Sequence, residues 1–192
     1  MGEISPILEK KWDHAFNIFF DINRSEVLEW DDFELLHDKI AAWRGLDAAE
    51  TAEATKALRS IWEGLVSLSD LDHDNRIRRF ILFSSLYEWH EMWKACLDKK
   101  QYPAWQDTYL KYIFKLLDTS GDNLIDCAEY VEVMMMYGLD PHKAEEAFGK
   151  FAQKDGRPVN SITYQDFSNL WNEYFRSTEP DTPGNFLFGL IF

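Results

Sequence analysis

The sequence lacks the features that mark secreted and membrane-spanning proteins. Its 192 residues include only two cysteines, Cys96 and Cys127, and neither belongs to a CxxC or Cys/His pattern. No disulfide framework is therefore expected, and the cytoplasm, a reducing compartment, is the simplest interpretation. The opening segment MGEISPILEKKWDH contains no apolar stretch of signal-peptide type. No apolar run approaches the length that a transmembrane helix needs, so we expect no transmembrane segment.

Positive charge is scarce, and so are catalytic motifs. The chain has 20 Lys and Arg against 34 Asp and Glu, which gives a net charge of −14. Because phosphate would be repelled, nucleic acid is disfavoured as a partner, whereas cations or basic peptides fit. The sequence holds no GxxxxGK[ST], GxSxG or HExxH motif, and its five histidines are scattered. We therefore expect no enzyme.

What the sequence does have is apolar periodicity around acidic stretches. Hydrophobic residues make up 46% of the chain and aromatic residues 16%, which excludes disorder. Four times, an apolar stripe at helical spacing leads into an acidic stretch and a second stripe leaves it. We expect these stripes to form the core, with a ligand cavity lined by the same aromatics as the alternative. The leading stripes are Leu8–Phe19, Leu58–Leu65, Trp105–Leu116 and Ala144–Phe151, and the leaving stripes are Phe33–Trp43, Leu86–Trp93, Tyr130–Met134 and Phe167–Tyr174.

The acidic stretch DTSGDNLIDCAE meets every requirement of a calcium loop. Such a loop supplies oxygens from positions 1, 3 and 5, the carbonyl of 7, position 9 and a bidentate carboxylate at 12. Asn123 suits the left-handed turn at position 6, and Ile125 is the apolar position 8, which faces a paired loop. The expected ligands are Asp118, Ser120, Asp122, the Leu124 carbonyl, Asp126 and Glu129.

The stretch DINRSEVLEWDD is a second candidate loop, with two departures. Position 6 is Glu26, which needs roughly 1–2 kcal/mol to enter a left-handed conformation. Position 12 is Asp32, one methylene shorter than Glu, so the cage is tighter. Both departures should lower calcium affinity, and the tighter cage suits magnesium as well. The expected ligands are Asp21, Asn23, Ser25, the Val27 carbonyl, Glu29 and Asp32.

The last acidic stretch, DGRPVNSITYQD, keeps the frame of a loop without its ligands. Arg157 stands at position 3 and Val159 at position 5, and a guanidinium would repel a metal ion. Ile162 keeps the apolar position 8. We expect this loop to stay empty and to pair with the third loop.

The stretch DLDHDNRIRRFILFSSLYE begins as a calcium loop but places Ile81 at position 12. Removing RRFILFS, residues 78–84, leaves DLDHDNRISLYE, in which Ser85 is position 9. The simplest interpretation is a seven-residue insertion, native or from an isoform or gene-model artefact, in an otherwise complete loop. The rival interpretation is a decayed site whose exit helix starts early. The expected ligands are Asp70, Asp72, Asp74, the Arg76 carbonyl and Glu88.

The apolar composition of this insertion favours a helical extension. Phe80, Ile81, Leu82 and Phe83 would each gain roughly 1.5–3 kcal/mol from burial. The segment has two alternative fates: it bulges out as a loop and lets Glu88 return to the site, or it extends the exit helix and carries Glu88 away by roughly 10 Å. The gain from burial favours the helix extension, or some other burial of the segment, over the bulge. We therefore expect the second site to be weak or empty.

Together these patterns predict an all-α fold. It would consist of four EF-hand helix-loop-helix units in two paired lobes, with short two-residue β-bridges between paired loops. Linkers fall near 44–49 and 98–104, so we expect an N-terminal pair over 1–100 and a C-terminal pair over 101–192.

The segments EWDDFEL, DTSGDN, WNEYF and GNFLFG resemble those of the calexcitin and sarcoplasmic calcium-binding protein family over nearly the whole chain. The resemblance implies a compact four-EF-hand protein with Ca²⁺ in the first three loops and an empty fourth. It also implies a cytosolic calcium sensor or buffer, which we expect to be a monomer, with an ion channel as a candidate target.

A second class that shares four EF-hands and many aromatics is that of coelenterazine-binding proteins and photoproteins. The chain ends in GLIF rather than in the C-terminal proline of photoproteins, and its fourth loop is degenerate. Met134, Met135 and Met136 would line a target groove in a sensor, although packing in the core is the simpler expectation.

Overall fold

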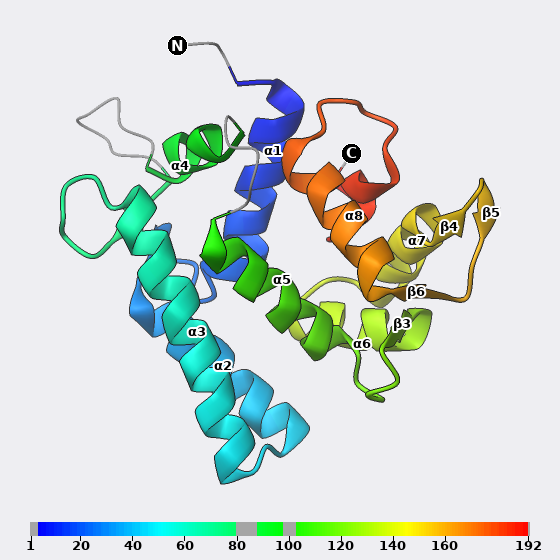
Figure 1. The fold of residues 1–192 in the computed structure, drawn as a ribbon, viewed down its shortest axis with the longest axis horizontal. Helices are drawn as coiled ribbons and strands as arrows, with labels where there is room; N and C mark the ends of the chain where they lie inside the picture. The colour runs from blue at the N-terminus through cyan, green and yellow to red at the C-terminus, as the bar shows by residue number, and fades with distance from the viewer. Residues whose placement is uncertain (1–3, 80–87, 98–102, 192) are drawn as a thin grey trace. The chain divides into compact units, whose positions relative to one another are not determined.

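The computed structural model describes residues 4–79, 88–97 and 103–191, and helices dominate them (Figure 1). Residues 80–84 of the expected insertion and Ser85 lie outside the described residues. The α-helices are α1 (Pro6–Ala15), α2 (Trp30–Arg44), α3 (Ala48–Ser69), α4 (Glu88–Leu97), α5 (Ala104–Leu117), α6 (Cys127–Met136), α7 (Pro141–Phe151) and α8 (Tyr164–Arg176). A π turn, η1 (Phe16–Phe20), follows α1, and a 3-10 turn, η2 (Pro183–Phe186), lies near the C-terminus.

Short antiparallel strand pairs join the loops two by two, as expected for paired loops. β1 (Val27–Leu28) pairs with β2 (Ile77–Arg78), which places Leu28 opposite Ile77. β3 (Leu124–Asp126) pairs with β6 (Ser161–Thr163), which places Ile125 opposite Ile162. All four position-8 side chains are buried. The expected β-bridges are confirmed, although those of the second pair are three residues long.

The chain forms two compact units, and their boundary differs from the expected one at residue 100. Residues 16–109 form one unit, and the residues before 16 and from 110 onward form the other. Helix α1 therefore belongs with the C-terminal EF-hand pair. The reason is a long-range polar contact: the buried Nζ of Lys11 donates to the carbonyls of Glu173 (3.1 Å) and Ser177 (2.8 Å) and to Oδ1 of Asn185 (2.9 Å).

Aromatic side chains fill the core of each unit. In the unit of residues 16–109, the Trp89 ring lies 5.3 Å from that of Phe16 and 5.0 Å from that of Phe20, measured between centroids. In the other unit, the rings of Tyr174 and Phe188 are 4.8 Å apart. The prediction that the aromatic stripes form core is confirmed for Phe16, Trp89 and Tyr174, which are all buried. Among the described residues, no helix combines the length and the apolar character needed to cross a bilayer.

Candidate metal centre

The third loop closes on itself through the carboxylate of Glu129. Its Oε1 accepts a hydrogen bond from the N–H of Ser120 at 2.8 Å, and its Oε2 accepts one from the N–H of Asp126 at 3.0 Å. The carboxylate of Asp126 in turn accepts from the N–H of Glu129 at 2.9 Å, which caps the start of α6. The residue at position 12 thus links the beginning of the loop, the end of the loop and the exit helix.

The first loop repeats this arrangement with a shorter side chain. Oδ1 of Asp32 accepts from the N–H of Asn23 at 3.1 Å, and its Oδ2 accepts from the N–H of Glu29 at 3.0 Å. Asp32 therefore reaches both ends of its loop despite having one methylene fewer than Glu129.

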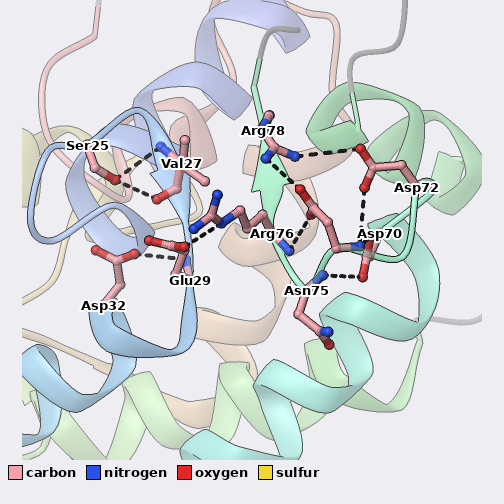
Figure 2. A network of polar contacts seen from close by, with 10 residues as sticks. Ser25, Val27, Glu29, Asp32, Asp70, Asp72, Asn75, Arg76 and Arg78 are labelled. Carbon is pink, nitrogen blue, oxygen red and sulfur yellow. Dashed lines mark hydrogen bonds and ion pairs between the residues drawn. The ribbon is translucent and has the colours of Figure 1, made fainter.

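The other ligand candidates of the first loop also converge. The two carboxylate oxygens of Asp21 accept from the N–H groups of Ser25 and Glu26, each at 2.9 Å. The Ser25 hydroxyl donates to the carbonyl of Val27 at 2.8 Å, so positions 5 and 7 present their oxygens side by side (Figure 2).

The second loop holds Glu88 in the place that Asp32 and Glu129 occupy in their loops. Oε1 of Glu88 accepts from the N–H of Leu71 at 3.1 Å, and its Oε2 accepts from the N–H of Arg78 at 2.9 Å. The side chain therefore contacts both ends of the loop. The prediction that Glu88 would be carried away from the second site is wrong.

Two features keep Glu88 at the second loop. Trp89 and Trp93 follow it along α4 and lie in the core, where they are 0% and 2% exposed, so moving Glu88 by several residues would move both rings. The strand pair Leu28–Ile77 fixes the other end of the loop.

The residue at position 9 of the second loop differs from the expected one. The N–H that bonds the position-12 carboxylate belongs to Arg78, which the sequence placed inside the insertion. Ser85, the expected position 9, lies outside the described residues.

The three aspartates of the second loop gather as the spacing predicts. One carboxylate oxygen each from Asp70, Asp72 and Asp74 lies within 4.8 Å of the other two, close enough to share a metal ion. Asp70 is buried and accepts from the N–H groups of Asp74 (3.1 Å) and Asn75 (2.9 Å), which orient it towards the loop interior.

Loops one to three share an unusual backbone, with positive φ at positions 4 and 6. This conformation costs a non-glycine residue energy, so its recurrence at the same two positions defines the loop type. Glu26 takes it at position 6, where the sequence indicated strain. The residues are Arg24 (60°) and Glu26 (64°), His73 (63°) and Asn75 (59°), and Gly121 (75°) and Asn123 (66°).

The fourth acidic stretch does not form such a loop. Its positive-φ residues are Asp155 (53°) and Gly156 (72°), at positions 1 and 2. They make the tight turn of a hairpin between β4 (Gln153–Lys154) and β5 (Arg157–Pro158). Among the described residues, the stretch therefore lacks the backbone that gathers ligands in the other three loops.

The carboxylates at position 12 are buried in all three loops, which affects their pKa values. Asp32 and Glu88 are 0% exposed and Glu129 is 8% exposed. Burial raises the pKa of Asp32 and of Glu88, against the hydrogen bonds from N–H groups that each accepts. At Glu129 burial acts in the same direction, but the hydrogen bonds from Asp126 and Ser120 outweigh it and lower the pKa. Buried anions of this kind need a cation or several donors nearby.

The donor set fits a hard divalent cation. Calcium takes six to eight oxygen ligands, and loops one to three offer carboxylates and a backbone carbonyl, to which loops one and three add hydroxyl or amide oxygens. Oδ1 of Asp118, at position 1 of the third loop, is buried, and no donor among the described residues bonds it. An oxygen in this state is a ready ligand.

The side chains of two arginines in the second loop make contacts that the sequence did not indicate. Nε of Arg76 donates to Oε1 of Glu29 in the first loop at 2.7 Å, and the Arg78 guanidinium approaches Asp72 and Asp74 (Figure 2). Their positions in the repeat, 7 and 9, were visible, but side-chain direction depends on how the paired loops face each other.

The methionines considered for a target groove differ in exposure. Met134 is buried in the core, whereas Met135 is 51% exposed. Packing in the core is therefore confirmed for Met134, and Met135 remains a candidate for a surface role.

No protein-family model matches the chain. The chain is 36% identical to Calexcitin-1 of Caenorhabditis elegans over 191 residues, which covers 99% of this chain and 90% of that one. Its fold is similar to the solved structure of a sarcoplasmic calcium-binding protein from amphioxus, with a TM-score of 0.77, 18% identity, and 97% and 98% of the two chains covered. It is also similar to a coelenterazine-binding protein of Renilla muelleri, with a TM-score of 0.62, 18% identity, and 95% and 94% covered.

The fold and the loop geometry thus define an EF-hand protein with four helix-loop-helix units. Because the likeness to Calexcitin-1 extends over nearly the full length of both chains, the protein belongs to the family of calexcitin and the sarcoplasmic calcium-binding proteins.

Proposed function

We propose that the protein binds calcium through its first three loops and acts as a cytoplasmic calcium sensor or buffer, without catalysis. The observation that carries this proposal is the position-12 carboxylate, which in all three loops accepts hydrogen bonds from the start of the loop and from position 9. The fourth loop, which lacks this arrangement, would pair with the third and stay empty.

The ligand residues differ in burial according to their position in the loop. Carboxylates at positions 1 and 12 are buried or half-buried and preformed, whereas Asp72, Asp74 and Asp122 are exposed. A bound calcium ion would neutralise these clustered charges and stabilise the fold by mass action. The relatives named as calcium-binding proteins support this function.

The first loop is also our candidate for magnesium. Its position-12 carboxylate is that of Asp32, and the hydroxyl of Ser25 already donates a hydrogen bond to the carbonyl of Val27. A smaller cage suits the shorter metal–oxygen bonds of magnesium, roughly 2.0–2.1 Å. Competition between the two ions at this loop alone would support the assignment.

The proposal is tested by isothermal titration of the metal-free protein with calcium. We expect saturation at three ions, with the third loop filling first. Saturation at one ion or none would overturn the proposal, and a fourth ion would show that the hairpin at Asp155 and Gly156 can open. Binding of coelenterazine, seen as a shift in its absorbance, would favour the ligand-binding class instead.

A hydrophobic dye added during the same titration separates sensor from buffer. A sensor exposes apolar surface when calcium binds, whereas a buffer changes little. A rise in dye fluorescence with calcium, weakened in Met135→Gln, would identify a sensor surface that could engage a target protein such as an ion channel. A flat signal would identify a buffer.

A further inference from the structure

The second loop already holds a cation of its own, the guanidinium of Arg78. Nη2 of Arg78 lies 2.6 Å from Oδ2 of Asp74, and its Nη1 lies 3.8 Å from Oδ2 of Asp72 (Figure 2). These are two of the three aspartates whose oxygens lie close enough together to share a metal ion. The Arg78 side chain is 21% exposed, so it is directed into the loop rather than into solvent.

The backbone keeps Arg78 at this place. Arg78 ends strand β2, opposite Val27, and its N–H donates to the Glu88 carboxylate at 2.9 Å. The residues with the corresponding N–H bond in the other loops are Glu29 and Asp126, which both carry negative charge. Among the three loops whose position-12 carboxylate contacts both ends of the loop, the second is the one with a cationic residue at position 9.

The Arg78 contacts are weaker than those that a metal ion would make. Among the described residues, the guanidinium makes one hydrogen bond, to Asp74, and its buried Nη1 has no acceptor within hydrogen-bond distance. Calcium would instead engage six to eight oxygens of the loop and its water. A long side chain such as that of Arg78 can turn outward without any change in the backbone.

We propose that Arg78 is a built-in competitor of calcium: its guanidinium neutralises Asp72 and Asp74 in the metal-free loop and must leave before an ion binds there. The inference rests on the proposed function, because it assumes that the second loop is a calcium site. It follows that this loop fills last of the three and sets a second, higher calcium threshold. Asp70, Asp74 and Glu88 remain preformed, so the arginine and not a decayed loop limits the affinity.

The test uses charge variants of neighbouring arginines in the full chain. In Arg78→Gln the competitor is gone, whereas the N–H bond to Glu88 remains because the backbone makes it. Arg79→Gln is the matched control: it removes the same charge one residue away, from a side chain whose contact is with Asn17 at 3.4 Å. Arg78→Lys keeps the charge and loses the fork of the guanidinium.

We expect calorimetric titration to show three calcium ions for each protein, with the weakest step tightened roughly tenfold to hundredfold in Arg78→Gln. Arg78→Lys should fall between Arg78→Gln and the parent, and Arg79→Gln should leave the step within about twofold of the parent. The double variant Arg78→Gln/Glu88→Gln should lose the tightened step, which assigns it to the second loop.

The inference is overturned if Arg78→Gln leaves the weakest step unchanged or weakens it, while helical circular dichroism shows an intact fold. Should Arg78→Gln fail to fold, Arg78→Lys decides in the same way: an affinity equal to the parent overturns the inference. Calcium at the first and third loops with no response to Arg78 would refute only this inference. A parent protein that binds no calcium would refute the proposed function with it.

Discussion

Arg76 of the second loop donates from Nε to Oε1 of Glu29 in the first loop at 2.7 Å. Glu29 is position 9 of its loop, so a residue of one candidate site holds a carboxylate of the other. The pair connects the two loops by charge in addition to the backbone pairing of Leu28 with Ile77.

The first prediction follows from this pair. Arg76→Gln should raise the calcium affinity of the first loop about two- to fivefold, because it frees the carboxylate of Glu29 and removes a nearby positive charge. The effect is small because the side chains of Arg76 and Glu29 are 53% and 32% exposed, and exposed ion pairs contribute little. Calorimetry measures it. In a Glu29→Gln background the substitution should have almost no effect; an equal gain there would show that Arg76 acts through something other than Glu29.

The second prediction concerns Glu129. Glu129→Gln should abolish the highest-affinity calcium step, because a neutral amide cannot serve as a bidentate carboxylate at position 12. The matched control is Glu132→Gln, one turn further along α6 and exposed, which should leave all steps in place. An unchanged first step in Glu129→Gln would assign the tightest site to another loop.

The third prediction compares two glycines. Gly156 has φ +72°. Apart from Gly156 itself and its two chain neighbours, no atom of the described residues lies within 4 Å of the place that a Cβ would take, so Gly156→Ala meets no clash but must adopt a left-handed conformation. We expect a loss of roughly 1–2 kcal/mol in the free energy of unfolding. Gly149 lies in α7, is exposed and has the same open surroundings, so Gly149→Ala should instead gain roughly 0.5–1 kcal/mol. Urea unfolding measures both, and a neutral Gly156→Ala would contradict the tight hairpin turn.

The fourth prediction concerns pH and Lys11. Burial lowers the pKa of Lys11 to about 8 from 10.5, against the opposing charge of Glu173. Between these two values the unfolded chain binds more protons than the folded one, so this group makes the free energy of unfolding rise with pH. The stability gap between the parent and Lys11→Met should therefore widen from about pH 7.5 to about pH 9.5.

Urea unfolding at both pH values tests this prediction. Tyr130 and Tyr174, whose pKa values burial raises, act in the opposite direction above their usual range, but they are common to both proteins. Lys11→Met should be less stable throughout, by about 1–3 kcal/mol, because carbonyl and amide oxygens lose their donor. A gap that narrows with pH would show that the folded chain holds the Lys11 proton more tightly than the unfolded chain does.

The sequence by itself determined the parts of this protein that depend on local spacing. Apolar residues at helical period predicted the all-helical fold. The linker near 98–104, together with the apolar residues at position 8, such as Ile125 and Ile162, predicted which loops pair. Asn123 indicated a left-handed turn because few residue types tolerate one, and the structure has φ 66° there. Each of these inferences needs only neighbours along the chain.

Only the tertiary structure decided where Glu88 lies, because its carboxylate bonds the N–H groups of Leu71 and Arg78, 17 and 10 residues away. Counting along the chain could not decide whether Glu88 is carried away from the second loop or returns to it. The choice depends on Trp89 remaining in the core and on the strand pairing at Ile77. In the same way, α1 joined the C-terminal unit because the acceptors of Lys11 lie 162 to 174 positions later. Contacts between residues so far apart in the sequence depend on tertiary packing, which local sequence patterns do not encode.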